Sequence, residues 1–161
     1  RSLVGSEMCI RDRGDIHIQS ADPMVPPAIR FNFMSAAYDR EGTLAAMRKA
    51  RELFSTSPLA EVVGEEIGPG PTCESDQDMV EWIKNNAETT YHPVGTCKMG
   101  NDPQAVVDDE LKVHGISGLR VADASIMPTL TSGNTNAPSI MIGEKCSEML
   151  LKSSLASKKA A

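Results

Sequence analysis

Polar and apolar residues alternate at two places near the start of the chain, over residues 14–20 and 28–33. A period of two is typical of a half-buried strand, so each stretch predicts a short β-strand. The three prolines of residues 21–27 predict an extended connection between them, because proline restricts its own backbone and that of the preceding residue. Later apolar stretches predict brief extended pieces over residues 106–107 and 111–113 and a strand over residues 119–122.

Three other stretches repeat their apolar residues every three or four positions, which is typical of an amphipathic helix. They predict helices over residues 38–54, from residue 75 to between residues 86 and 88, and over residues 137–152. The Ser75 hydroxyl, with Asp78 three positions later, predicts a cap at the start of the second helix.

Composition excludes several classes of protein. The 161 residues are enough for one ordinary domain with its own core. The 16 basic and 22 acidic residues give a net charge of -6 without a basic cluster, which argues against nucleic-acid binding. No apolar run approaches the roughly 18 residues of a transmembrane helix. The four cysteines lack the paired spacing of a metal site or disulfide framework, which indicates reduced thiols. We therefore expect a cytoplasmic protein, and peripheral association of that protein with a membrane stays open.

Residues 1–13 differ from the rest, because they begin without methionine and follow no period. Glu7 and the charged residues 11–13 leave no apolar region for a signal peptide. The segment resembles translated sequencing-adapter sequence joined to a partial gene, so we expect it to be foreign or disordered. A genuine flexible N-terminal arm is the alternative. At the other end, residues 154–161 predict a flexible tail.

A histidine lies in a constrained turn of the sequence Tyr-His-Pro-Val-Gly-Thr, residues 91–96. Pro93 favours an extended conformation at His92 and keeps it out of a helix interior. Histidine suits general base chemistry near neutral pH, so His92 is a candidate base. A His-Pro turn by itself is more often structural, and we assign His17 and His114 only structural roles.

A polar stretch, residues 133–138, precedes the last predicted helix. Asn136 is a favourable N-cap and Pro138 is tolerated in a first turn, so helix initiation explains much of this stretch. A helix start also presents free N–H groups and a positive dipole to an anion. Asn134 is not needed for capping, which leaves its amide for hydrogen bonding to a ligand.

Asp123 follows the predicted strand 119–122. Ligand crevices form at strand ends in open α/β sheets, so Asp123 is a candidate binding residue. An ordinary turn aspartate is the alternative that local sequence favours.

Three ordered motifs together resemble one family. They are YHPVGTCKMG at residues 91–100, VADASIMP at residues 121–128 and GNTNAPSIMIGEK at residues 133–145. They closely resemble the glucose–methanol–choline (GMC) oxidoreductases, and within these the choline dehydrogenase-like branch. The resemblance extends over about residues 14–152.

The resemblance implies a mixed α+β and α/β fold, the C-terminal part of a two-domain GMC protein. Residues 14–105 would mainly form the substrate-binding domain with its antiparallel sheet. Residues 106–153 would return to the Rossmann-like FAD-binding domain as its last strand and helix. The chain has no G-x-G-x-x-G motif, which cradles the FAD pyrophosphate, so it is expected to correspond to the C-terminal third of an enzyme and to be inactive alone.

The family's site residues carry over position by position. The resemblance makes His92 the catalytic base and Asn134 the second catalytic residue. It places the ribityl and pyrophosphate groups of FAD beside Asp123 and Ala124, and the flavin pyrimidine ring beside Asn136, Ala137 and Pro138. It implies no metal.

The implied reaction oxidises the CH–OH group of a small alcohol. His92 would take the hydroxyl proton while a hydride passes to flavin N5, and oxygen or a quinone-like compound would reoxidise the flavin. Two alternatives remain open, a cyanohydrin lyase on the same fold and a truncated module without catalysis. The sequence does not specify the alcohol or the oligomeric state.

Overall fold

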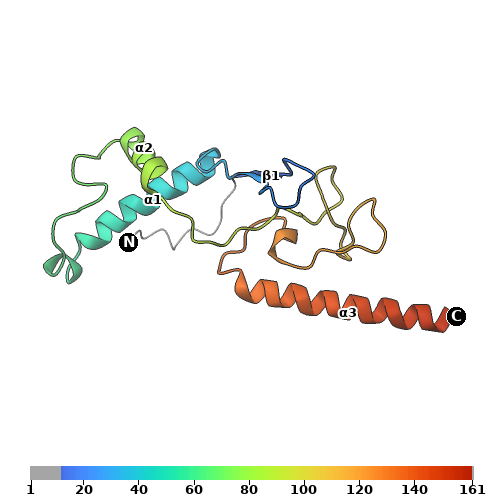
Figure 1. Ribbon diagram of the computed structural model, residues 1–161. Coiled ribbons are helices and arrows are strands. Elements are labelled where there is room, and N and C mark those ends of the chain that lie inside the picture. Colours follow the sequence, from blue (N-terminus) through green and yellow to red (C-terminus); the bar gives the residue numbers. More distant parts are fainter. Residues whose placement is uncertain (1–11, 161) are drawn as a thin grey trace. The chain divides into compact units, whose positions relative to one another are not determined.

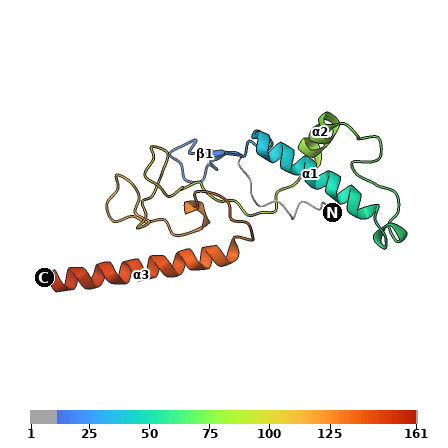
Figure 2. The ribbon, with the colours of Figure 1, turned by 180° about the vertical axis from the view of Figure 1, so that it is seen from behind.

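The computed structural model of the protein describes residues 12–160, with side chains described for residues 12–155. The chain divides into two compact units, one ending at Thr90 and the other beginning at Tyr91. Figures 1 and 2 show the elements of the first unit in blue to green and those of the second in yellow to red. Of the segment expected to be foreign or disordered, residues 1–11 lie outside the described residues.

The two predicted N-terminal strands are present and paired. β1 spans Asp15–His17, β2 spans Ala28–Arg30, and they run antiparallel with Ile16 opposite Ile29. Each strand has only three residues, and both isoleucines are more than a third exposed. A two-stranded ribbon is marginal without a further layer, so the small antiparallel sheet buries little apolar surface by itself.

Two helices form the core of the first unit. α1 spans Ala37–Phe54, α2 spans Asp76–Asn86, and a 3-10 turn, η1, lies between them at Leu59–Glu61. The buried residues of this core are Leu44, Cys73, Met79 and Ile83. Both predicted helices are therefore confirmed, with ends within one or two residues of the expected positions.

Ser75 caps α2 as its position predicts. Its Oγ accepts a hydrogen bond from the Asp78 backbone N–H at 3.1 Å and donates one to the Asp78 carboxylate at 2.5 Å. The first N–H groups of a helix have no partner within the helix, so this side chain satisfies one of them.

A residue far from α1 in the sequence, Asp12, stabilises the start of that helix. Its N-cap residue, Ala36, has no side chain to accept a hydrogen bond, and the Asp12 carboxylate accepts from the Ala36 N–H at 2.6 Å and from the Ser35 hydroxyl at 2.8 Å. Partial burial acts to raise the pKa of Asp12, but the hydrogen bonds from Ala36, Ser35 and Met34 outweigh it and hold that pKa below its usual value. Asp12 belongs to the segment that the sequence sets apart, yet its carboxylate is hydrogen-bonded to Ser35 and Ala36 at the start of α1.

The second unit is built from short bridged pieces around Val107, which is fully buried. Val107 pairs with Met99 on one side and Val113 on the other, and Lys112 pairs with Arg120. The prediction of a strand over residues 119–122 is wrong, because among the described residues only the isolated bridge between Lys112 and Arg120 forms there. Leu111 has a left-handed backbone with φ of 64°, which interrupts the extended conformation that a longer ladder needs.

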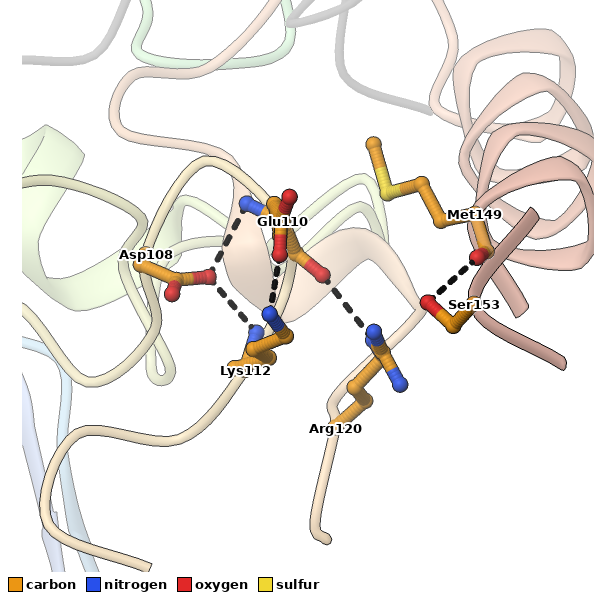
Figure 3. Close-up of polar contacts among 6 residues, drawn as sticks. All are labelled: Asp108, Glu110, Lys112, Arg120, Met149 and Ser153. Atoms are coloured by element: carbon orange, nitrogen blue, oxygen red, sulfur yellow. Dashed lines mark hydrogen bonds and ion pairs between the residues drawn. The ribbon is translucent and has the colours of Figure 1, made fainter. Parts of the chain in front are cut away.

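Polar contacts hold the turn at residues 108–112 (Figure 3). The Asp108 carboxylate accepts hydrogen bonds from the backbone N–H groups of Glu110 at 2.9 Å and Lys112 at 2.8 Å. Arg120 Nε donates to the Glu110 carbonyl at 3.1 Å, which ties the turn to the following bridged piece.

A long helix closes the core of the second unit. α3 spans Asn136–Ala160, past the predicted end at residue 152, and the flexibility expected of residues 154–161 stays a prediction. Its Ile142 and Cys146 pack with residues of the bridged pieces and of the 3-10 turn η2, Ala124–Ile126. The buried cluster is Val107, Leu111, Ile126, Met127, Ile142 and Cys146. No described helix has the length and apolar character required to cross a membrane.

Candidate functional site

His92 lies in a sharp turn at the start of the second unit. Tyr91 has a φ of 61° and Gly95 a φ of 85°, so left-handed backbone occurs on both sides of the His-Pro pair. The His92 side chain is half-buried, whereas Tyr91 is 78% exposed. The constrained turn predicted from the sequence is therefore present, and it leaves His92 partly accessible.

The segment after His92 is attached to η2. The Cys97 N–H donates to the Ser125 carbonyl at 3.0 Å, and the Met99 N–H donates to the Ile126 carbonyl at 2.8 Å. These bonds bring the first sequence motif beside the second.

Asp123 is the N-cap of η2. Its Oδ1 accepts a hydrogen bond from the Ser125 N–H at 2.7 Å, which is the turn role that local sequence favours. The carbonyls of Asp123 and Ala124 accept from Ile126 and Met127. In the described part of the chain, nothing accepts from the N–H groups of Asp123 and Ala124, so these two donors can meet a ligand.

The head of α3 differs from expectation by one residue. The helix begins at Asn136, and its first hydrogen bond runs from the Ser139 N–H to the Thr135 carbonyl at 3.0 Å. The cap position therefore belongs to Thr135, and the expectation that Asn136 is the N-cap is wrong. The reason is that the helical turn already includes the Asn136 backbone, so its side chain projects from the first turn.

Exposed groups surround this helix end. Asn134, Asn136 and Ala137 are exposed, and Pro138 is half-buried. No described residue accepts a hydrogen bond from the Asn136 or Ala137 N–H, which is ordinary for a first turn. These N–H groups and the positive end of the helix dipole favour a negatively charged ligand atom.

One side-chain contact joins the first motif to the third. His92 Nδ1 lies 3.0 Å from the Thr135 hydroxyl oxygen, within hydrogen-bond distance, although the two residues are 43 positions apart. Thr135 is buried, with 9% of its surface exposed. Sequence reasoning missed Thr135. A hydroxyl residue directly before a helix whose third position is proline is the signal that could have found it.

The other histidines have local partners. His114 Nε2 lies 3.0 Å from the Gly100 carbonyl, and His17 lies 3.5 Å from the Asp15 carboxylate. Over residues 12–160, no cluster of three His, Cys, Asp or Glu side chains could hold a metal ion. The contacts of His17 and His114 fit the structural roles assigned to them.

Comparison with known proteins gives a family and several relatives. The family model described as "GMC oxidoreductase" matches residues 11–143. The "Oxygen-dependent choline dehydrogenase" of Cronobacter sakazakii (strain ATCC BAA-894) is 51% identical over 136 residues, 84% of this chain and 24% of that protein. The protein of the same name from Escherichia coli O127:H6 is 50% identical over 138 residues, 86% of this chain and 25% of that protein.

Solved structures with the same fold include pyridoxine 4-oxidase from Mesorbium loti, with a TM-score of 0.81 and 33% identity over 88% of this chain and 28% of that one. A formate oxidase from Aspergillus oryzae RIB40, studied for FAD modification, has a TM-score of 0.79 and 34% identity over 87% and 25% of the two chains. A fungal aryl-alcohol oxidase has a TM-score of 0.80 and 28% identity over 92% and 25%. The chain spans about a quarter of the length of these relatives, less than the expected third.

Proposed function

This chain belongs to the GMC oxidoreductase family, its fold is the C-terminal part of the GMC fold, and we propose that the longer protein containing it oxidises the CH–OH group of a small alcohol with FAD as its cofactor. The names of its relatives support the substrate class, since two are choline dehydrogenases and one similar structure is an aryl-alcohol oxidase. The observation that carries the proposal is the fixed position of His92 at the head of α3, beside the residue that follows Asn134.

The residues of this chain fit one side of the cofactor. The N–H groups of Asn136 and Ala137, which have no acceptor among the described residues, suit the electron-rich pyrimidine end of a flavin. Those of Asp123 and Ala124, likewise without a described acceptor, suit its phosphate and ribityl oxygens. Pro138 completes the stretch beside the ring, by the family resemblance. When bound, FAD supplies the acceptor for the hydride, at flavin N5.

His92 is proposed to take the hydroxyl proton of the alcohol. Its Nδ1 faces Thr135, so Nε2 is the ring nitrogen left for the substrate. Asn134 is exposed and adjacent to Thr135, and its amide is proposed to orient the substrate oxygen and stabilise its developing charge. A base of this kind contributes typically 10²–10⁴-fold to a rate.

The proposal also divides the chain between two domains. We assign residues 14–105 mainly to the substrate-binding domain and residues 106–153 to the FAD-binding domain. Within the second compact unit, the loop that carries His92 is hydrogen-bonded to η2, and His92 contacts Thr135 directly before α3. We assign both η2 and α3 to the FAD-binding part. A base on this loop is therefore held by the elements proposed to contact the flavin.

An anaerobic titration of the full-length, FAD-containing protein tests the proposal. Choline and an aryl alcohol are added separately, and the visible absorbance of the flavin is recorded. Bleaching by either alcohol is expected. Admission of air, and separate anaerobic addition of a soluble quinone, then show which of the two acceptors reoxidises the flavin. Unchanged flavin together with cyanide release from a cyanohydrin would replace the proposal with a lyase.

A further inference from the structure

The Thr135 hydroxyl lies 3.0 Å from His92 Nδ1 and is the only described side-chain partner of that ring. We propose that Thr135 is a positioning residue, whose hydroxyl accepts a hydrogen bond from Nδ1–H and so fixes both the orientation and the tautomer of His92. This inference rests on the proposed function for its effect on turnover, but the contact and the tautomer can be measured without it.

The helix start removes one competing partner of this hydroxyl. A residue at the cap position normally accepts a hydrogen bond from the N–H of the second or third helical residue, as Ser75 does from Asp78 at the start of α2. Behind Thr135 the third helical residue is Pro138, which has no N–H. The capping bond to the third position is therefore absent, and in the described part of the chain the Thr135 hydroxyl contacts His92 instead of either capping partner.

Thr135 is itself held rigidly. Its carbonyl accepts two hydrogen bonds from Ser139, one from the backbone N–H at 3.0 Å and one from the hydroxyl at 2.6 Å. Its side chain is β-branched and buried, so few rotamers are available to it. A fixed hydroxyl orients a histidine ring better than a mobile one, because less entropy is lost when the hydrogen bond forms.

The tautomer follows from the chemistry of the neutral imidazole ring. One nitrogen carries the hydrogen and the other accepts a proton, and the partner of one nitrogen selects the role of the other. If Nδ1–H donates to Thr135, Nε2 has the free lone pair that a base requires. Without the hydroxyl, the ring can turn and the two tautomers can mix, so the competent fraction falls.

The decisive experiment compares Thr135→Val, which keeps the shape and loses the hydroxyl, with Thr135→Ser, which keeps the hydroxyl. Both are made in the full-length protein with ¹⁵N-labelled histidine, and the His92 signals are assigned by their loss in His92→Gln. At a pH where the ring is neutral, we expect hydrogen on Nδ1 in the natural protein and in Thr135→Ser, and a mixture in Thr135→Val. Thr129→Val, an exposed threonine of the same unit, is the control.

Turnover is measured on the same samples, with FAD content determined for each. Loss of one hydrogen bond is expected to lower kcat on the order of tenfold in Thr135→Val, with KM little changed and Thr135→Ser close to natural. A neutral His92 with its hydrogen on Nε2 in the natural protein overturns the inference, even if no variant folds. An unchanged tautomer in Thr135→Val also overturns it. If His92→Ala keeps full turnover while Thr135→Val still alters the tautomer, the proposed base fails and the positioning contact stands.

Discussion

The backbone N–H of Cys97 donates a 3.0 Å hydrogen bond to the carbonyl oxygen of Ser125. Cys97 lies five residues after His92 in the first motif, and Ser125 directly follows Ala124 in the second. Backbone bonds of this kind do not depend on any side chain of the site. The loop that carries His92 is therefore fixed to η2 independently of the imidazole ring. Substitutions of the His92 side chain should change chemistry more than folding, which makes them informative.

His92→Ala in the full-length protein should lower kcat by about 10²–10⁴-fold while FAD stays bound, because the base that takes the alcohol proton is lost. Steady-state kinetics with flavin content measured for each preparation tests this. His17→Ala is the matched control, since the His17 side chain is 75% exposed and lies in the first unit. His114→Ala should also retain turnover. Wild-type turnover of His92→Ala at full FAD occupancy would show that another group is the base.

Asn134→Ala should lower kcat less than His92→Ala does and more than His17→Ala or His114→Ala does. The amide is proposed to stabilise the developing charge on the substrate oxygen, and loss of such a donor typically costs roughly 10²–10³-fold in kcat. Asn134→Asp is the more severe partner variant, because a carboxylate repels that charge. Equal kcat for Asn134→Ala and the natural protein would remove Asn134 from the site, whatever His92 does.

Asn136→Ala should change stability little, because Thr135 occupies the cap position and the Asn136 side chain is exposed in the first turn. A change within about 0.5 kcal/mol is expected for such a surface position. Ser75→Ala is the comparison, and loss of its observed cap should cost about 1 kcal/mol. Denaturant unfolding measures both. If Asn136 contacts the flavin, its variant lowers the reduction potential; an unchanged potential argues against that contact.

The 161-residue chain expressed alone should bind a hydrophobic dye or self-associate. Its second unit leaves Leu119 47% and Ile140 61% exposed, and Leu151 on α3 is 65% exposed. Val121 and Met149 are half-buried against the core, so they contribute less exposed apolar surface. Ile140→Lys with Leu151→Lys should reduce dye binding. A monomer that melts cooperatively with bound yellow flavin would contradict the prediction.

Glu148 should titrate far below its usual range in the folded protein. Hydrogen bonds from Lys145 and Lys152, each 2.6 Å, lower its pKa from 4.5 to about 2. A carboxyl with a depressed folded-state pKa contributes stability above its unfolded value, and that contribution is lost as pH falls from about 4.5 towards about 2. A ¹³C titration of the carboxyl measures this, and Lys145→Gln with Lys152→Gln should raise the midpoint. Because the site is exposed, high salt should raise it too.

Local determinants were readable in the sequence. The helix periods predict α1 and α2 closely, Ser75 with Asp78 predicts the cap of α2, and Pro93 with Gly95 predicts the turn around His92. Each depends on residues within a few positions of one another, so neighbouring side chains and backbone preferences are enough to determine it. The order of three motifs gave the family, which the matches to GMC oxidoreductases confirm.

The tertiary structure decided what depends on distant packing. The bridge at Arg120 stays isolated because Leu111 has a left-handed backbone, which no apolar pattern reveals. The contact of His92 with Thr135 exists because Ile142 and Cys146 pack α3 onto the core of the second unit, which brings the helix start to the turn 43 residues earlier. A sequence pattern specifies which residues can cap, turn or pack, but a pair so far apart is determined only when the core between them closes.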